Sequence, residues 1–158
     1  MPDSSQPNSR RGYIGGSDAA MIMNGQAEAV WKRKTGRAEE PDLSGILPAV
    51  MGHYTESLNR DWFTRKTGLF VQRPAMNEDG SFRLEKHPTA EYIACHPDGV
   101  VREADGSFAL FEAKHLSERQ TIHDALDDYY WQLVHNALVC NMRVAYLSVL
   151  FGNIAWDY

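Results

Sequence analysis

The stretch around residues 105–114 constrains the fold most, because its pattern predicts a tight turn followed by a core strand. An Asp-Gly pair at 105–106 is a strong hairpin signal. Side chains alternate along a strand, so Phe108, Leu110, Glu112 and Lys114 should share one face. A face that begins by burying apolar side chains would then end with a carboxylate and an ammonium.

The register of this hairpin decides which residue lies opposite Glu112. A three-residue loop at 104–106, with its glycine in the left-handed conformation, places Glu103 opposite Ser107. Counting back along the preceding strand then places Asp98 directly across from Glu112. Directly opposed residues of an antiparallel pair have β-carbons about 4.5–5.5 Å apart. A two-residue loop would shift the register by one and separate the two carboxylates.

Two carboxylates at that distance repel each other unless a proton or a cation lies between them. Mg²⁺ or Mn²⁺ suits such a site, because hard divalent ions take oxygen ligands and keep several waters. Lys114, on the same face, could orient or deprotonate a water or stabilise charge on a phosphate. Pro97 cannot donate to the ladder, so the first strand should bulge or fray there. A surface ion pair between Glu112 and Lys114 at a strand end is the alternative interpretation.

The rest of the chain predicts helices around these strands, and hence an α/β or α+β domain with a central sheet. Ser17 is a plausible N-cap after two glycines, with Asp18 in the first turn. Apolar residues at spacings of three and four predict a long helix that Gly68 would end. Helices are expected at 27–34, at 46–66 with a stripe of Leu47, Met51, Tyr54, Leu58 and Trp62, and at 121–141 with a stripe of Ile122, Leu126, Tyr129, Leu133 and Ala137; strands are expected at 92–101, 108–116 and in the final segment 143–152.

Composition narrows the classes of protein. The 158 residues suffice for one domain with a core, and no apolar run is long enough to span a bilayer, so we expect a cytoplasmic protein. Cys95 and Cys140 are too few for a disulfide framework and read as small core residues. The formal charge of −5 argues against a simple nucleic-acid coat, although the basic run at 32–37 leaves an enzyme possible.

The ordered motifs "HPDG", "FEAK", "GHYTE" and "YWQLVHNAL" resemble those of the PD-(D/E)xK nuclease superfamily. The N-terminal "IGGSDAA" and "VWKRKTG" narrow the resemblance to the YqaJ-type viral recombinases, the branch that includes the lambda exonuclease. The resemblance runs from about Arg10 to Leu147. It implies a restriction-endonuclease-like core with a central mixed sheet flanked by helices, formed by residues 10–158 after a flexible lead at residues 1–9.

The resemblance also assigns roles to residues. It implies that Asp98 and Glu112 bind metal, with the Ala113 backbone carbonyl as a further ligand and Lys114 as the catalytic lysine. Glu56 would lie near a second metal or its waters. Two further roles follow from the motifs: Gln132 would help position the site, and Arg10 and Ser17 would bind a DNA 5′-phosphate.

Elementary chemistry leaves other interpretations open for several of these residues. A serine at a helix start offers backbone N–H groups to an anion and an arginine can grip one, yet Ser17 could be only an N-cap and Arg10 only a surface charge. Glu56 stands four residues before Arg60 and could form an exposed ion pair. Gln132 could be a solvated amide. The remaining polar or aromatic residues near the motifs are interpreted as structural, solvated or packing residues: His96, His115, His53, Tyr54 and Trp131.

The expected function is therefore Mg²⁺-dependent (or Mn²⁺-dependent) 5′-to-3′ exonuclease activity on double-stranded DNA ends in phage-type recombination, with a single-strand annealing protein as a possible partner. A ring-shaped homo-oligomer, a trimer by analogy with the lambda enzyme, is expected to gather the basic side chains. Relatives usually continue with further helical sequence beyond the predicted last strand. An endonuclease of the same superfamily and a non-catalytic DNA-end-binding protein are the alternatives.

Overall fold

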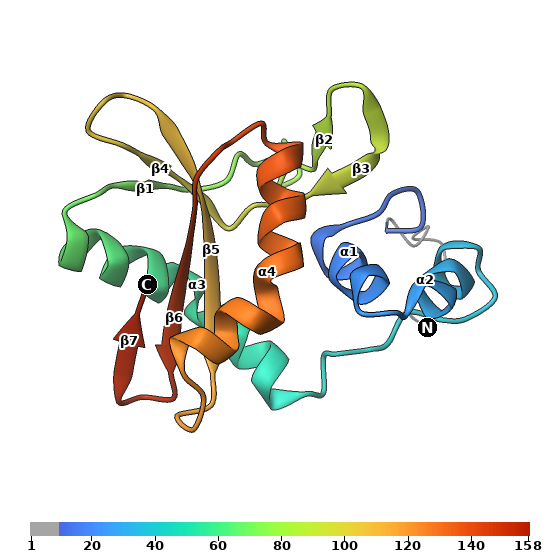
Figure 1. The fold of residues 1–158 in the computed structure, drawn as a ribbon, viewed down its shortest axis with the longest axis horizontal. Coiled ribbons are helices and arrows are strands. Elements are labelled where there is room, and N and C mark those ends of the chain that lie inside the picture. Colours follow the sequence, from blue (N-terminus) through green and yellow to red (C-terminus); the bar gives the residue numbers. More distant parts are fainter. Residues whose placement is uncertain (1–9) are drawn as a thin grey trace.

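The computed structural model describes residues 10–158, so the predicted lead at 1–9 lies outside the described residues. A five-stranded mixed sheet forms the centre of the fold, and a separate two-stranded hairpin and a pair of short helices stand beside it (Figure 1). The elements are α1 (Gly16–Met23), α2 (Ala27–Lys34), α3 (Leu47–Thr67), β1 (Val71–Gln72), β2 (Glu85–His87), β3 (Ala90–Cys95), β4 (Gly99–Arg102), β5 (Phe108–Leu116), α4 (Ile122–Val139), β6 (Ala145–Phe151) and β7 (Ala155–Asp157).

The sheet has the strand order β1-β4-β5-β6-β7. Only β5 and β6 are parallel, and α4 makes the crossover between them, as parallel neighbours require. The predicted fold class, a mixed central sheet flanked by helices, is confirmed. None of the helices in residues 10–158 is long and apolar enough to cross a membrane.

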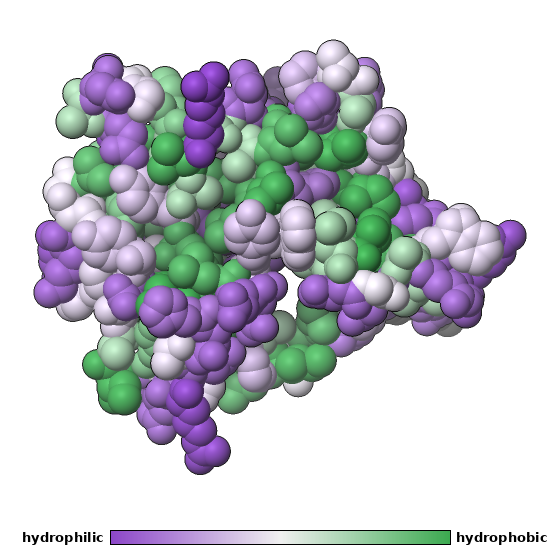
Figure 2. All heavy atoms as spheres, in the orientation of Figure 1, coloured by the Kyte–Doolittle hydropathy of each residue, from purple (hydrophilic) through white to green (hydrophobic). Residues whose placement is uncertain are grey.

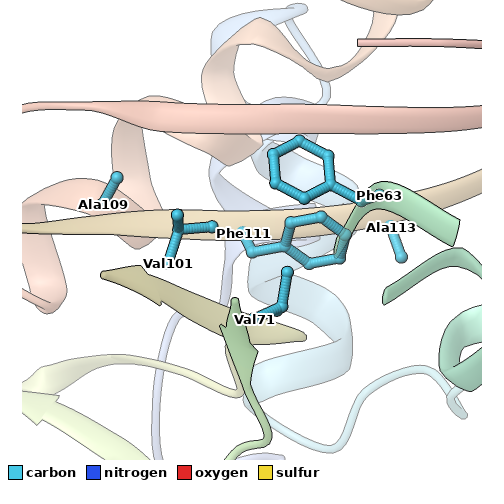
Figure 3. Packing of buried hydrophobic residues seen from close by; sticks show 6 residues of the cluster. All are labelled: Phe63, Val71, Val101, Ala109, Phe111 and Ala113. Carbon is cyan, nitrogen blue, oxygen red and sulfur yellow. The ribbon is translucent and has the colours of Figure 1, made fainter. Parts of the chain in front are cut away.

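Each face of the sheet buries its own apolar cluster under one helix. Phe63 of α3 packs against Phe111 at 5.2 Å between ring centroids, on the face that also carries Ala109 and Ala113 (Figure 3). The opposite face packs against α4. Because side chains alternate along β5, its α4 face carries Leu110, Glu112 and Lys114, as predicted. The α4 cluster consists of Ala125, Leu133, Leu147, Val149 and Phe151.

Helix α3 has nearly the predicted bounds, but it buries a different face from the one predicted. Its predicted apolar stripe is largely exposed, with Leu47 69% and Tyr54 74% accessible. The buried residues are instead Asn59, Arg60 and Phe63. Spacing identified a stripe, but it could not show that polar side chains on another face would be drawn to the carbonyls of the sheet.

Two further expectations are corrected. The strand expected at 92–101 is interrupted at His96–Asp98, so that β3 joins the small hairpin and β4 joins the main sheet. Pro97, which lacks an N–H, stands in that interruption. Phe108, expected to be buried, is 52% exposed at the strand start. The short strands β1, β2 and β7 were not predicted as separate elements.

The two short helices lie together at one side of the sheet, with α1 packed on α4 (Figure 1). Helix α2 has the predicted bounds. The N-cap of α1 is Gly15, two residues before the expected N-cap Ser17, which lies inside the first turn. Asp18 caps this helix instead, because its carboxylate accepts the Gly15 N–H at 3.0 Å.

Candidate active site

The predicted hairpin register is confirmed. In β4 and β5, Arg102 pairs with Phe108 and Gly99 pairs with Phe111. Gly106 closes the three-residue loop with φ +86°, the left-handed conformation that glycine adopts without strain. One residue further back, just before β4 begins, this register sets Asp98 beside Glu112.

Asp98 is held by two hydrogen bonds, one from a backbone N–H of β5 and one from a side chain of α3. Its Oδ2 accepts the Ala113 N–H at 2.8 Å, and its backbone carbonyl accepts Arg60 Nη1 at 3.0 Å. Burial, followed by the negative charge of Glu112, raises the pKa of Asp98 to about 8. The raised pKa reflects the repulsion between the two carboxylates, which a proton or a cation between them would relieve.

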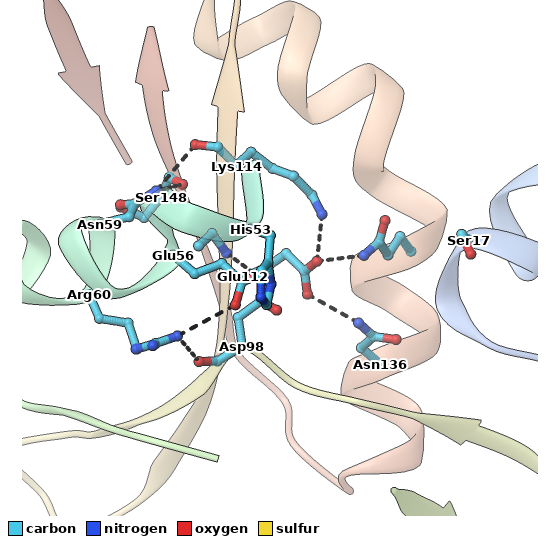
Figure 4. A network of polar contacts seen from close by, with 12 residues as sticks. Ser17, His53, Glu56, Asn59, Arg60, Asp98, Glu112, Lys114, Asn136 and Ser148 are labelled. Atoms are coloured by element: carbon cyan, nitrogen blue, oxygen red, sulfur yellow. Dashed lines mark hydrogen bonds and ion pairs between the residues drawn. The ribbon is translucent and has the colours of Figure 1, made fainter. Parts of the chain in front are cut away.

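Glu112 is 2% exposed and is surrounded by donors (Figure 4). Its Oε1 accepts hydrogen bonds from Lys114 Nζ at 2.7 Å and from Gln132 Nε2. Its Oε2 accepts a hydrogen bond from Asn136 Nδ2 at 3.1 Å. These contacts exclude the interpretation of Glu112 as part of a surface ion pair, and they make Gln132 a direct partner of the carboxylate.

Lys114 points to the same carboxylate and lies over the Tyr129 ring, 4.7 Å from its centroid. Burial alone would lower the pKa of Lys114, but the carboxylates of Glu112 and Asp98 outweigh burial and raise it. The raised pKa favours the cationic form of the side chain. Of the roles left open by the sequence, stabilising negative charge fits this state better than accepting a proton from water.

The donor set of this site fits a hard divalent cation, because it offers two adjacent carboxylates and little nitrogen or sulfur. A divalent cation would also relieve the repulsion that raises the pKa of Asp98. Within residues 10–158, no group of three or more His, Cys, Asp or Glu side chains is arranged to hold a metal. Water and the Ala113 carbonyl would have to complete the coordination, and the role of that carbonyl remains a prediction.

Glu56 lies on α3 near Asp98, but it is not grouped with the two carboxylates (Figure 4). Its Oε2 is 4.0 Å from Arg60 Nη1, and its Oε1 is 3.6 Å from His53 Nδ1. The alternative ion pair with Arg60 is thus present, although Arg60 is buried rather than exposed. A role of Glu56 at a second metal remains a prediction.

Arg10 and Ser17 are brought together, as the predicted phosphate site requires. Arg10 Nη2 donates to Ser17 Oγ at 3.0 Å. That bond uses the acceptor side of the hydroxyl, which as a donor could also bind an anion. Ser17 also lies in the first turn of α1, where backbone N–H groups are unpaired and the helix dipole favours negative charge.

A cavity of about 340 Å³ joins this pair to the partners of Glu112. In Figure 2 the lobe formed by α1 and α2, at the right, stands apart from the lower main body across a hollow. Gly16 lets the two walls meet, because a β-carbon there would lie 2.5 Å from Asn136 Oδ1. The lining residues are Arg10, Tyr13, Gly15, Gly16, Ser17, Cys95, His96, Gln132 and Asn136.

Several residues of this arrangement were missed from the sequence. Asn136 stands one turn after Gln132, and that spacing could have revealed it. Asn59 had no local signal: its amide donates to the Lys114 carbonyl at 3.2 Å and the Ser148 carbonyl at 2.8 Å, and thereby ties α3 to β5 and β6. Cys95, read as a core residue, is buried, and its sulfur lies 3.7 Å from that of the half-buried Cys140.

Comparisons with known proteins identify the family and the fold. Residues 7–143 match the YqaJ-like viral recombinase domain. The fold is similar to LHK-Exo in complex with dAMP, with a TM-score of 0.64 and 21% identity over 93% of this chain and 73% of that one. It is also similar to the alkaline exonuclease LHK-Exo from Laribacter hongkongensis, with a TM-score of 0.63 and 18% identity over 94% and 76%. No curated protein matches. The family match covers most of the chain, and the chain therefore belongs to the YqaJ-like viral recombinase domain family.

Proposed function

We propose that this protein is a metal-dependent exonuclease that digests double-stranded DNA from 5′-phosphorylated ends. One observation carries the proposal: the cavity that Arg10 and Ser17 line is also lined by Gln132 and Asn136, the two amides bonded to Glu112. An anchor for a terminal phosphate beside a carboxylate pair suits an enzyme that works inward from an end. The dAMP in the similar LHK-Exo structure supports a deoxynucleotide substrate.

The division of labour follows from the contacts. Asp98 and Glu112, with the Ala113 carbonyl, would hold Mg²⁺, which would supply Lewis-acid activation of water and of the phosphate. Lys114, as a cation beside the carboxylates, would donate to a phosphate oxygen as negative charge develops there. Gln132 fixes the orientation of the Glu112 carboxylate. Glu56 would approach a second metal or its waters.

The family supports a place in phage-type recombination, with a single-strand annealing protein as a partner that takes up the exposed strand. We also propose a homo-oligomer, a ring trimer by analogy. A ring would concentrate basic side chains around DNA despite the formal charge of −5.

The proposal is tested by digesting linear duplex DNA with 5′-phosphate or 5′-hydroxyl ends, with Mg²⁺ or with a chelator, beside covalently closed circles. Metal-dependent loss of the 5′-phosphorylated strand with circles spared is expected. Lys114→Ala and Asp98→Ala should abolish digestion, whereas Lys32→Ala, at an exposed lysine paired with Glu28, should not.

Each of the other outcomes would contradict one part of the proposed function. Cut circles would identify an endonuclease. Binding of DNA ends without turnover in Mg²⁺ or Mn²⁺ would identify a non-catalytic end-binding protein. Full activity in both the Lys114 and Asp98 variants would refute the assigned chemistry.

A further inference from the structure

Lys34 belongs to the basic run at 32–37, yet it does not face solvent. It is the last residue of α2, and its side chain is 10% exposed. Its Nζ lies 2.7 Å from Asp18 Oδ2 and donates to the Arg10 backbone carbonyl at 2.7 Å. It also lies 5.5 Å from the centroid of the Tyr13 ring. A buried ammonium needs close partners, and these contacts indicate that Lys34 has a structural role among the residues around it.

Both polar partners of Lys34 belong to the wall that carries the proposed phosphate anchor. The hydrogen bond from Lys34 to the Arg10 carbonyl holds the backbone from which the Arg10 side chain reaches Ser17 Oγ. The Asp18 carboxylate caps α1 through the Gly15 N–H, and so fixes the helix turn that contains Ser17. Lys34 thus holds together the two parts of the proposed anchor, Arg10 and the first turn of α1, from the side away from the cavity.

Lys34 also compensates the negative charge of Asp18 at this wall of the cavity. Asp18 is 3% exposed and places a negative charge in the helix turn where an incoming phosphate would lie. Lys34 is its close cation, while Arg33 is more distant at 3.8 Å. Without the ammonium, Asp18 would repel a dianionic phosphate through a medium that screens poorly.

We propose that Lys34 is a positioning residue for terminal-phosphate recognition: it holds Arg10 and the first turn of α1 in place and neutralises Asp18, so that the cavity accepts a 5′-phosphate. This inference rests on the proposed function, because it deepens the end-phosphate site. Lys34 itself stands behind the wall and is not among the residues that line the cavity.

The test measures binding without cleavage. A short duplex with a 5′-phosphate or a 5′-hydroxyl end is titrated with protein in a chelator, and fluorescence anisotropy gives the two dissociation constants. Lys34→Met should reduce the preference for the phosphorylated end about tenfold, the scale of one charge-assisted hydrogen bond, while binding of the hydroxyl end stays unchanged. Lys34→Arg should retain most of the preference. Lys32→Met is the control, because Lys32 lies on the same helix but is exposed and pairs with Glu28.

A second variant separates charge from folding. Asp18→Asn in the Lys34→Met background removes the uncompensated carboxylate, so it should restore part of the phosphate preference; no recovery would refute the electrostatic role. If Lys34→Met unfolds, the comparison is made on the double variant and on Lys34→Arg, and loss of the preference in Lys34→Arg equal to that in an Arg10→Ala variant would refute the inference.

The two levels of failure are distinguishable. A wild-type protein that degrades linear DNA but binds both ends equally would refute the phosphate anchor itself. A wild-type protein that prefers the phosphorylated end, with an unchanged preference in a folded Lys34→Met variant, would refute only the role of Lys34.

Discussion

Replacing Gly99 by alanine should destabilise the protein although it adds only one methyl group. Gly99 begins β4 directly after Asp98 and pairs with Phe111. A β-carbon there would lie 2.6 Å from Val71 Cγ1 and 3.1 Å from the Gln72 carbonyl oxygen. Val71 is buried and β-branched, and Gln72 presents backbone, so neither neighbour can retreat easily.

The magnitude follows from these contacts. Overpacking a close-packed site costs about 1–3 kcal/mol, and an alanine that fits would return only about 0.4–1 kcal/mol through the unfolded chain. For a domain of this size the net loss, up to about 2.6 kcal/mol, should lower the melting temperature by up to about 10 °C. Displacement of β4 would also move Asp98 away from the Ala113 N–H, so stabilisation by Mg²⁺ should shrink.

Thermal unfolding followed by circular dichroism, with and without Mg²⁺, measures both effects. Gly52→Ala is the matched control, because a β-carbon at this position in α3 would meet nothing within 4 Å. Alanine in a helix interior is favoured over glycine by about 0.5–1 kcal/mol, so this variant should be more stable than wild type. A Gly99→Ala protein as stable as Gly52→Ala would refute the close approach of β1 to β4.

Three further outcomes are expected. The pKa of Asp98 is raised from 3.8 to about 8, so its contribution to the stability of the protein without metal is fully present below pH 4 and is lost as the pH rises through about 8. Melting scans should show this loss, and the stability added by Mg²⁺ should grow over the same range. Asp98→Asn should abolish both trends. Lys114→Met leaves the buried Glu112 without its cation, and chemical unfolding should show a loss of roughly 3 kcal/mol; an unchanged stability would contradict the buried pair. Treatment with the thiol oxidant diamide should join Cys95 and Cys140, whose sulfurs are 3.7 Å apart, so the intact mass should fall by two hydrogens and Cys140→Ser should prevent it.

The sequence predicted those parts of the site that depend on local rules. Alternation along β5 and the turn at 105–106 sufficed to set Asp98 beside Glu112, because a hairpin register follows from loop length. The orientation of α3 could not be obtained in this way, since Asn59 reaches carbonyls of β5 and β6 that lie 55 and 89 residues away. The same limit hid Lys34: a run of basic residues is usually solvated, and only the fold brings α2 against Arg10 and Asp18.

The arrangement of α1 on α4 supports the proposal of an end-specific activity over that of internal cutting. Gln132 and Asn136 contribute to the cavity wall and, on the same helix, hold both oxygens of Glu112. An occupant of the cavity is therefore placed relative to the carboxylates by a helix rather than by a loop. Since Gly16 allows the first turn of α1 to meet the side chains of Gln132 and Asn136, the proposed phosphate anchor and the carboxylate pair would share one support. A terminal phosphate fixed on such a support would set the cleaved bond at a constant distance from the strand end, which is the requirement of stepwise digestion.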